Sequence, residues 1–266
     1  INVPTGKDSL SMKQKYADKE GIAPGTVGVS AAGNCNDIVN IVEPVLQKNG
    51  GNIYYINLSK DKHQLGGSSF AQIRNKIGSE TPTIKDAANF KKAFNVIQEL
   101  IKEDKIIAGH DIASGGLITT LLELCFADIN LGAELDLTSI GESDSTKLLF
   151  AENSGIVFQS ASGADIETVL TNNNIEFFSI GKVKQQASLT IKNHTDSFDL
   201  SIENLRNTWY KTSFLLDQKQ TANKLAKDRY DNYKKQSLSF SFPSQFTGKF
   251  PAIDISIQRP KAAVLR

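Results

Sequence analysis

The chain has 266 residues, of which 39% are hydrophobic and 22% charged, as is typical of a globular protein with one large or two smaller domains. Its net charge of +1 lacks the basic excess of a dedicated nucleic-acid binder. No apolar run approaches the ~18 residues of a membrane span. We therefore expect neither nucleic acid nor a membrane as a partner.

The first half of the chain alternates strand, loop and helix patterns. After an arm over residues 1–25, we predict the elements listed next from β-propensity, turn residues and helical periodicity. They are buried strands over 26–32 and 52–58, a short helix or extended edge over 41–48, a helix over 68–77, an amphipathic helix over 86–103 with Phe90, Phe94, Ile97 and Ile101 on its apolar face, and a short strand over 106–109.

The second half continues as mixed helix and strand. The predicted elements are a buried helix over 117–126, a strand over 132–137, a helix over 147–150, a strand over 156–160, a helix over 165–172 and strands over 177–183 and 187–191. Strands neighbour each other too often for a βαβ repeat, so we predict an α+β domain over 26–200. Residues 202–233 are predicted to be helical and 237–243 extended.

Both cysteines, Cys35 and Cys125, are predicted to be buried thiols of a cytoplasmic protein, because two cysteines make neither a disulfide framework nor a metal site. The chain starts at Ile1 without a methionine and ends at Arg266 inside an apolar, strand-like run. We therefore expect it to be a fragment of a longer protein.

Three glycine loops are candidates for binding a phosphate-containing cofactor. The first, with Gly6, Lys7, Asp8 and Ser9, offers a lysine charge and backbone N–H groups, or forms only a solvated turn; it lacks P-loop spacing. The second opens a helix at Gly66, Gly67 and Ser68, where a helix N-terminus attracts anions, although a plain tight turn explains it equally well. In the third, with Ser114, Gly115 and Gly116, the glycines permit close backbone approach or positive φ, and packing alone also explains them.

In this order the motifs resemble the second synthetase half of phosphoribosylformylglycinamidine synthase, the large amidotransferase of purine biosynthesis. The resemblance spans essentially the whole chain. It rests on GKDSLSM at 6–12, LGGS at 65–68, HDIASGG at 110–116 followed by TTLLELCFA at 119–127, FAENSG at 150–155, LRNTWYKT at 205–212 and RPKAAVLR at 259–266.

The resemblance implies an architecture. Residues 1–25 would be the tail of a preceding synthetase subdomain, and 26–200 would resemble the C-terminal domain of aminoimidazole ribonucleotide synthetase. Residues 201–258 would form a helical linker, and 259–266 would start a truncated glutaminase domain. The glutaminase cysteine would lie beyond Arg266, so neither Cys35 nor Cys125 is expected to be a nucleophile.

The implied reaction is the ATP-dependent conversion of formylglycinamide ribonucleotide to formylglycinamidine ribonucleotide, with glutamine as amido donor. ATP or ADP and magnesium are the implied cofactors, because phosphorylation of an amide oxygen requires phosphate charge to be neutralised. We assign no catalytic residue here and expect the chain to be inactive without the missing synthetase and glutaminase domains. The alternative is a nucleotide-binding or structural module of the same fold.

Asp111 is the metal candidate, because the acid of this HD pair is a magnesium ligand of an auxiliary nucleotide in the family. Asp111 could instead cap the following helix. Ala113 and Ser114 stand where the family has a nucleotide-contacting serine and an acid, so one hydrogen-bond donor is lost. The other family ligands would precede Ile1, which leaves only part of the roughly six-oxygen shell that magnesium requires.

Four further residues have two readings each. We favour His110 as a satisfied core histidine over a residue that orients its loop. Glu152 either faces the site or is merely exposed. Trp209 and Tyr210 are expected to be packing anchors of the linker rather than base-stacking residues.

Overall fold

The structure, a computed structural model, describes residues 13–22, 29–30, 32–35, 37–128, 130–222, 224–235 and 240–249. The chain divides into two compact units, Ile1–Ile38 with Gly248–Arg266, and Val39–Thr247. In the first unit, strands β1 (Lys13–Tyr16) and β2 (Lys19–Ile22) pair antiparallel as a hairpin. The sequence analysis expected only an arm there, because charged residues such as those of β1 give no burial pattern to read.

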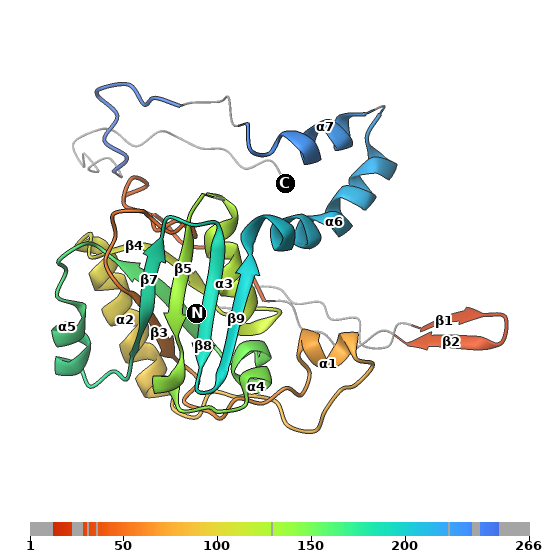
Figure 1. Ribbon diagram of the computed structural model, residues 1–266, viewed down its shortest axis with the longest axis horizontal. Coiled ribbons are helices and arrows are strands. Elements are labelled where there is room, and N and C mark those ends of the chain that lie inside the picture. Colours follow the sequence, from red (N-terminus) through yellow and green to blue (C-terminus); the bar gives the residue numbers. More distant parts are fainter. Residues whose placement is uncertain are drawn as a thin grey trace, which may run out of the picture. The chain divides into compact units, whose positions relative to one another are not determined.

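The second unit contains a seven-stranded sheet in the order β4-β6-β3-β7-β5-β8-β9 (Figure 1). All neighbours are antiparallel except the parallel pair β5 and β8. The α+β prediction is therefore confirmed. The strands are β3 (Ile53–Asn57), β4 (Ile106–Asp111), β5 (Gly132–Asp136), β6 (Gly155–Ser160), β7 (Phe178–Lys184), β8 (Ser188–Asn193) and β9 (Asp196–Ser201).

Helices cover both faces of this sheet, with α2 and α5 on one face and α3 and α4 on the other (Figure 1). Alternate residues of β3 serve the two layers: Tyr54 and Ile56 pack toward α2 and α5, whereas Ile53 and Tyr55 pack toward α3. The helices are α1 (Ser69–Ile73), α2 (Ala87–Lys102), α3 (Gly116–Phe126), α4 (Ser145–Phe150), α5 (Ile166–Asn172), α6 (Ile202–Gln220) and α7 (Leu225–Asn232), with a 3₁₀ turn over Thr138–Ile140.

Helix α2 confirms the predicted amphipathic helix but not its whole apolar face. Asp86 caps the helix, its carboxylate accepting from the N–H of Asn89 at 2.8 Å. Ala93, Ile97 and Leu100 are the buried residues, and Phe94 is 51% exposed. One residue corresponds to about 100° of helix rotation, so Phe94 points away from the side chain of Ala93 that meets the sheet.

Other elements differ from the sequence prediction. The strand over 26–32 lies largely outside the described residues, and Val29 within it is exposed and belongs to no strand. Residues 41–48 form neither a helix nor a strand, and only Glu43 makes an isolated bridge to Ala108. Strand β9 was not predicted, and the linker is broken into α6 and α7. Most of the extended segment predicted over 237–243 lies outside the described residues.

Cys125 confirms the predicted burial and Cys35 contradicts it. Cys125 lies on the buried face of α3, and burial raises the pKa of its thiol to about 12. Cys35 is exposed, because it sits in a segment of irregular backbone outside the sheet. Within the described part of the chain, no helix is long and apolar enough to cross a membrane.

The two cysteines should therefore differ sharply in reactivity. We expect a thiol-specific alkylating reagent to modify Cys35 in the folded chain and to leave Cys125 unmodified until the chain is unfolded, because the thiolate is the reacting form. Peptide mass mapping before and after addition of denaturant checks this. Equal modification of both cysteines under native conditions would contradict the burial of Cys125.

Candidate functional site

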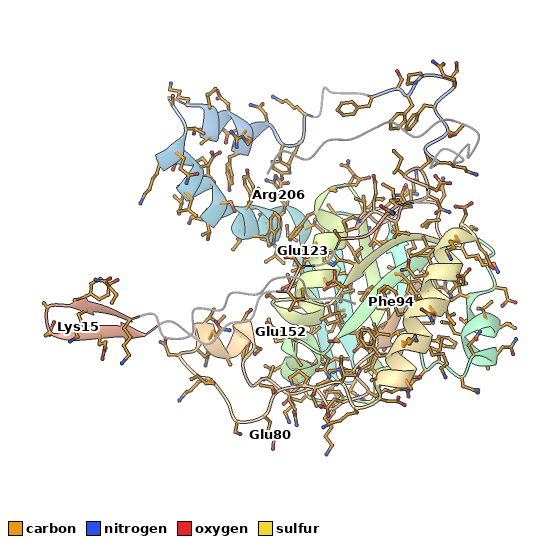
Figure 2. All side chains as sticks on the ribbon, turned by 180° about the vertical axis from the view of Figure 1, so that it is seen from behind. Lys15, Glu80, Phe94, Glu123, Glu152 and Arg206 are labelled. Atoms are coloured by element: carbon orange, nitrogen blue, oxygen red, sulfur yellow. The ribbon has the colours of Figure 1, made fainter. Side chains whose placement is uncertain are left out.

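The segment between α4 and β6 joins two of the glycine loops. Glu152 lies in this segment, and its Oε1 accepts hydrogen bonds from the N–H of Ser69 and the N–H of Gly115, each at 2.8 Å (Figure 2). Ser69 starts α1 and Gly115 precedes α3. One carboxylate oxygen thus brings together loops that are 46 residues apart in sequence, from 69 to 115.

Glu152 places a carboxylate at the N-terminal end of α3, which has no side-chain cap of its own. The capping position is Gly115, which has φ of +93° and no side chain to accept a hydrogen bond. Negative charge near a helix N-terminus is favourable, because the first N–H groups have no partner within the helix. The carboxylate therefore already occupies part of the position at which the sequence suggested a cofactor anion.

Close packing accounts for Gly116. Its φ is +75°, and a Cβ atom built on it would lie 2.8 Å from the carbonyl oxygen of Leu149 and 2.9 Å from that of Ala151. The backbone of α3 can therefore approach the end of α4 only at a glycine. Ser114 is exposed in the turn just before this pair.

The loop at Gly66, Gly67 and Ser68 is a tight turn closed by local hydrogen bonds. Ser68 Oγ donates to the carbonyl oxygen of Leu65 at 2.6 Å and accepts from the N–H of Ala71 at 3.2 Å. Gly66 donates its N–H to the carbonyl oxygen of Glu80 at 2.8 Å, and Gly67 has φ of +72°. The predicted helix of ten residues shrinks to the five of α1.

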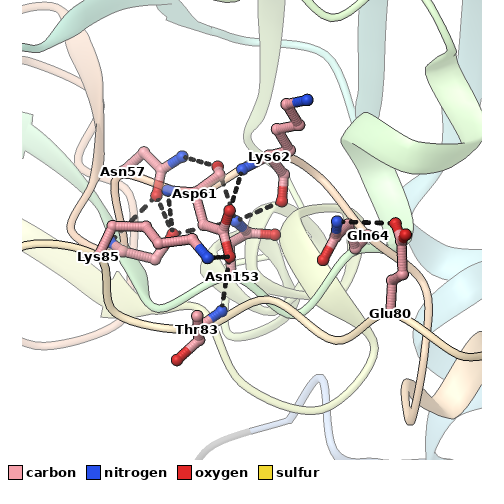
Figure 3. Close-up of polar contacts among 9 residues, drawn as sticks. Asn57, Asp61, Lys62, Gln64, Glu80, Thr83, Lys85 and Asn153 are labelled. Atoms are coloured by element: carbon pink, nitrogen blue, oxygen red, sulfur yellow. Dashed lines mark hydrogen bonds and ion pairs between the residues drawn. The ribbon is translucent and has the colours of Figure 1, made fainter.

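Asn153, next to Glu152, holds a further loop. Its side chain is buried, and Nδ2 donates to Ser59 Oγ at 3.0 Å and to the carbonyl oxygens of Asp61 and Lys62, each at 3.2 Å (Figure 3). The N–H of Thr83 donates to the Asp61 carboxylate and, together with the N–H of Lys62 and nearby Lys85, lowers the pKa of that group. Glu152 and Asn153 together thus hold three loops, those that contain Ser69, Gly115 and residues 59–62. The sequence analysis did not predict this role.

A cavity of about 780 Å³ lies beside the Asn153-bound loop. Its walls carry both signs of charge, and Lys60 is paired with Glu176 across 3.0 Å. Burial lowers the pKa of His63 in the same wall, so its ring is neutral at pH 7. The LGGS motif reaches this cavity through Leu65, whereas neither Asp111 nor the Gly115–Gly116 pair lines it. The titratable lining residues are Lys60, Asp61, Lys62, His63, Glu80, Glu142, Lys147 and Glu176.

Asp111 ends strand β4 with its side chain 77% exposed. It does not cap α3, because the capping position is Gly115, so that alternative is wrong. The carboxylate contacts the ring of His110, with Oδ1 at 3.2 Å from Nδ1. His110 is partly buried, and its Nε2 lies 3.2 Å from Oε2 of Glu123 on α3. Both ring nitrogens therefore face acceptor oxygens, one of them on the candidate ligand Asp111, and a neutral imidazole has a single N–H to donate.

His110 and Asp111 also line a cavity of about 330 Å³ between β4 and α2. Its other walls are largely apolar and include Ile97, Ile101 and Phe158. The cavity is thus small and mostly apolar, with the Asp111 carboxylate and the His110 ring among its lining groups.

The described residues do not make a complete magnesium site. Asp111 supplies oxygen, the donor type that magnesium prefers, but among these residues no three His, Cys, Asp or Glu side chains come together as a metal-binding group. The first glycine loop, with Gly6, Lys7, Asp8 and Ser9, lies outside the described residues.

Comparison with known proteins identifies the domain. Residues 48–192 match the family model described as AIR synthase related protein, C-terminal domain. The chain belongs to this family. The match extends from just before β3 almost to the end of β8, so the second and third glycine loops, Asp111 and Glu152 lie within the family domain, and the first glycine loop lies outside it.

Curated relatives match along the whole chain. It is 35% identical over 280 residues to the probable phosphoribosylformylglycinamidine synthase, chloroplastic/mitochondrial, of Arabidopsis thaliana. It is 30% identical to the phosphoribosylformylglycinamidine synthases of Homo sapiens and Saccharomyces cerevisiae. All of this chain is covered, but only 19–21% of each relative, so the chain spans about a fifth of their length. The predicted homology to this synthase is confirmed.

Solved structures show weaker likenesses. Structures of Thermotoga maritima PurL complexed with ATP and with FGAR are 15% and 16% identical, with TM-scores of 0.47 and 0.49. Each match covers 64% of this chain, and 28% and 30% respectively of the solved chain. We base no assignment on them.

Proposed function

We propose that the chain is the AIR-synthase-type C-terminal domain of the second synthetase half of a phosphoribosylformylglycinamidine synthase. This ligase would use ATP and glutamine to convert formylglycinamide ribonucleotide to formylglycinamidine ribonucleotide in purine biosynthesis. The observation that carries the proposal is the match of the whole chain to synthases from a plant, a human and a yeast. We keep a cytoplasmic location as part of the proposal, although the role alone does not require it, since the Arabidopsis thaliana relative is named chloroplastic/mitochondrial.

The boundaries proposed for the chain follow the same resemblance. Residues 1–25 would end a preceding synthetase subdomain and 26–200 would form the family domain. Residues 201–258 would be the helical linker, and 259–266 would begin a glutaminase domain. The missing synthetase and glutaminase domains are then the partners of this chain. Without them we expect no ligase activity. The buried Cys125, whose thiol pKa is raised, is not expected to serve as a glutaminase nucleophile.

Within this domain, Asp111 is the residue that we assign to a nucleotide site for ATP or ADP with magnesium. Its carboxylate is exposed, is not used as a helix cap and borders an apolar cavity. Ser114, Gly115 and Gly116 follow Asp111 by three to five residues in the chain. Glu152 holds this segment through its hydrogen bond from the N–H of Gly115. Since the described residues supply one carboxylate, the remaining ligands would come from elsewhere in the enzyme.

Binding of Mg-ADP to the chain, measured by isothermal titration calorimetry, tests this assignment. We expect weak binding that is lost in Asp111→Ala, because that variant removes the exposed carboxylate. Asp199→Ala, on exposed strand β9, is the matched control and should bind as the wild type does.

Unchanged binding by Asp111→Ala would contradict the assignment and remove Asp111 from the nucleotide site. Absence of binding by the wild type would show that the chain holds no self-contained nucleotide site and that the site needs residues from elsewhere in the enzyme. Hydrolysis of ATP by the chain in the presence of the ribonucleotide would contradict the expected inactivity.

A further inference from the structure

A chain of polar contacts connects helix α6 to the end of strand β4. Trp209 on α6 donates its indole Nε1–H to Oε1 of Glu123 at 2.9 Å. The other oxygen of Glu123, Oε2, lies 3.2 Å from Nε2 of His110. Glu123 therefore divides its two oxygens between a residue of α6 and a residue of β4 (Figure 2).

The next contact reaches Asp111. His110 Nδ1 lies 2.7 Å from the main-chain carbonyl oxygen of Asp111 and 3.2 Å from its Oδ1. Nδ1 of His110 thus faces oxygen atoms of Asp111 on β4, and Nε2 faces the carboxylate of Glu123 on α3. Contacts at both nitrogens fix the rotation of the imidazole ring, and the ring in turn holds one oxygen of the exposed carboxylate.

Aromatic contacts position the α6 end of this chain of polar contacts, although Trp209 is half exposed. The Trp209 ring lies against Phe126 of α3, with ring centroids 5.4 Å apart, and against Tyr210 with centroids 6.3 Å apart. Helices α3 and α6 therefore meet at the indole. The sequence analysis expected Trp209 to be only a packing anchor, but its N–H also makes a directed hydrogen bond to Glu123.

We propose that Glu123 and Trp209 are positioning residues for the Asp111 carboxylate, so that the placement of α6 is coupled to the end of β4. The functional meaning of this coupling rests on the proposed role of Asp111 in nucleotide binding. Helix α6 follows the family domain, so a movement of the segment beyond that domain would reach Asp111 through two side chains, Glu123 and His110. A residue that acts through another in this way can alter binding without touching the ligand.

Trp209 is the only tryptophan of the chain, which gives the coupling its own reporter. A ¹⁵N-labelled sample has one indole Nε1–H resonance, and its chemical shift depends on the oxygen that accepts the hydrogen bond. We expect Glu123→Gln to shift this resonance, because the accepting carboxylate becomes an amide. Asp111→Asn, at the far end of the chain of contacts, should shift it too, in the absence of any ligand.

The matched control is Glu134→Gln, which changes an exposed carboxylate on β5 and should leave the indole resonance in place. The proposal is overturned if Asp111→Asn leaves the resonance at its wild-type position while Glu123→Gln shifts it. The hydrogen bond from Trp209 to Glu123 would then not be coupled to Asp111. It is equally overturned if Glu123→Gln has no effect. These measurements need no nucleotide and do not depend on enzyme activity.

A second variant connects the coupling to binding. Trp209→Phe keeps an aromatic ring near Phe126 and removes the N–H donor together with part of the indole ring system. It should fold and should weaken Mg-ADP binding about 2- to 10-fold. Unchanged affinity would overturn the coupling. If the wild type binds no Mg-ADP, the proposed nucleotide site fails, and the indole resonance still decides whether α6 and Asp111 are coupled.

Discussion

Replacing Gly116 by alanine should destabilise the domain by about 2–5 kcal/mol. Two costs add. The φ of +75° places an L-residue in the left-handed region, at about 1–2 kcal/mol, and the new Cβ would lie 2.8–2.9 Å from backbone oxygens of α4 and the segment after it. Those oxygens belong to Leu149 and Ala151 and cannot rotate away as a side-chain end could. Urea unfolding followed by circular dichroism measures the loss.

Gly163→Ala is the matched control for this prediction. Gly163 has φ of +74°, almost the same as Gly116, but a Cβ there meets nothing within 4 Å. We expect it to lose only the conformational cost of about 1–2 kcal/mol. Equal losses in the two variants would show that close packing of α3 on the end of α4 contributes nothing at Gly116.

Loss of the Glu152 carboxylate should cost about 2–4 kcal/mol in the free energy of unfolding. Glu152→Ala leaves the N–H groups of Ser69 and Gly115 without their acceptor, and a hydrogen bond to a charged group is worth about 1.5–3 kcal/mol. We place the sum below two full bonds, because Glu152 is only partly buried and water can replace some of the contact. Amide hydrogen exchange should rise at Ser69 and Gly115 together.

Glu152→Gln separates geometry from charge. The amide keeps an acceptor oxygen near both N–H groups, so most of the loss should be recovered, leaving about 1 kcal/mol for the removed charge at the α3 N-terminus. If exchange rises at Gly115 alone in Glu152→Ala, the bridge to the Ser69 loop is not formed in solution, and the two glycine loops are independent of each other.

Much of the second unit could be read from the sequence because its strands and helices have strong patterns. Buried β3, with apolar or aromatic residues from Ile53 to Ile56, and the capped α2 are examples. Strand β9 was missed because its polar residues Asp196, Ser197 and Asp199 give no apolar pattern typical of a strand. It lies at the exposed edge of the sheet, and its pairing with β8 is known only from the fold. Phe94 was misplaced because helical spacing alone does not say which of two apolar stripes meets the sheet.

The site was only partly readable for a different reason. The glycine pairs and the His110–Asp111 pair are visible as short motifs. The residues that connect these motifs in the structure are single carboxylate and amide side chains, and nothing in the neighbouring sequence assigns them that role. Glu152 was left between two readings, and Glu123 and Asn153 carried no local signal. Their contacts join residues 37, 94 and 13 positions apart, as in Glu152 with Gly115, Asn153 with Ser59, and Glu123 with His110. Only the fold brings such pairs together.

The position of β3 in the interior of the sheet also sets when this domain can fold. Its neighbours are β6 and β7, and Ile53 pairs with Gln159, about a hundred residues later. A chain emerging from the ribosome therefore exposes the apolar β3 until β6 and β7 have been synthesised. Pairing over such separations is slow, and an unpaired strand is open to association with other chains. Cells making this domain should depend on chaperones during that interval more than cells making a helical domain of equal length.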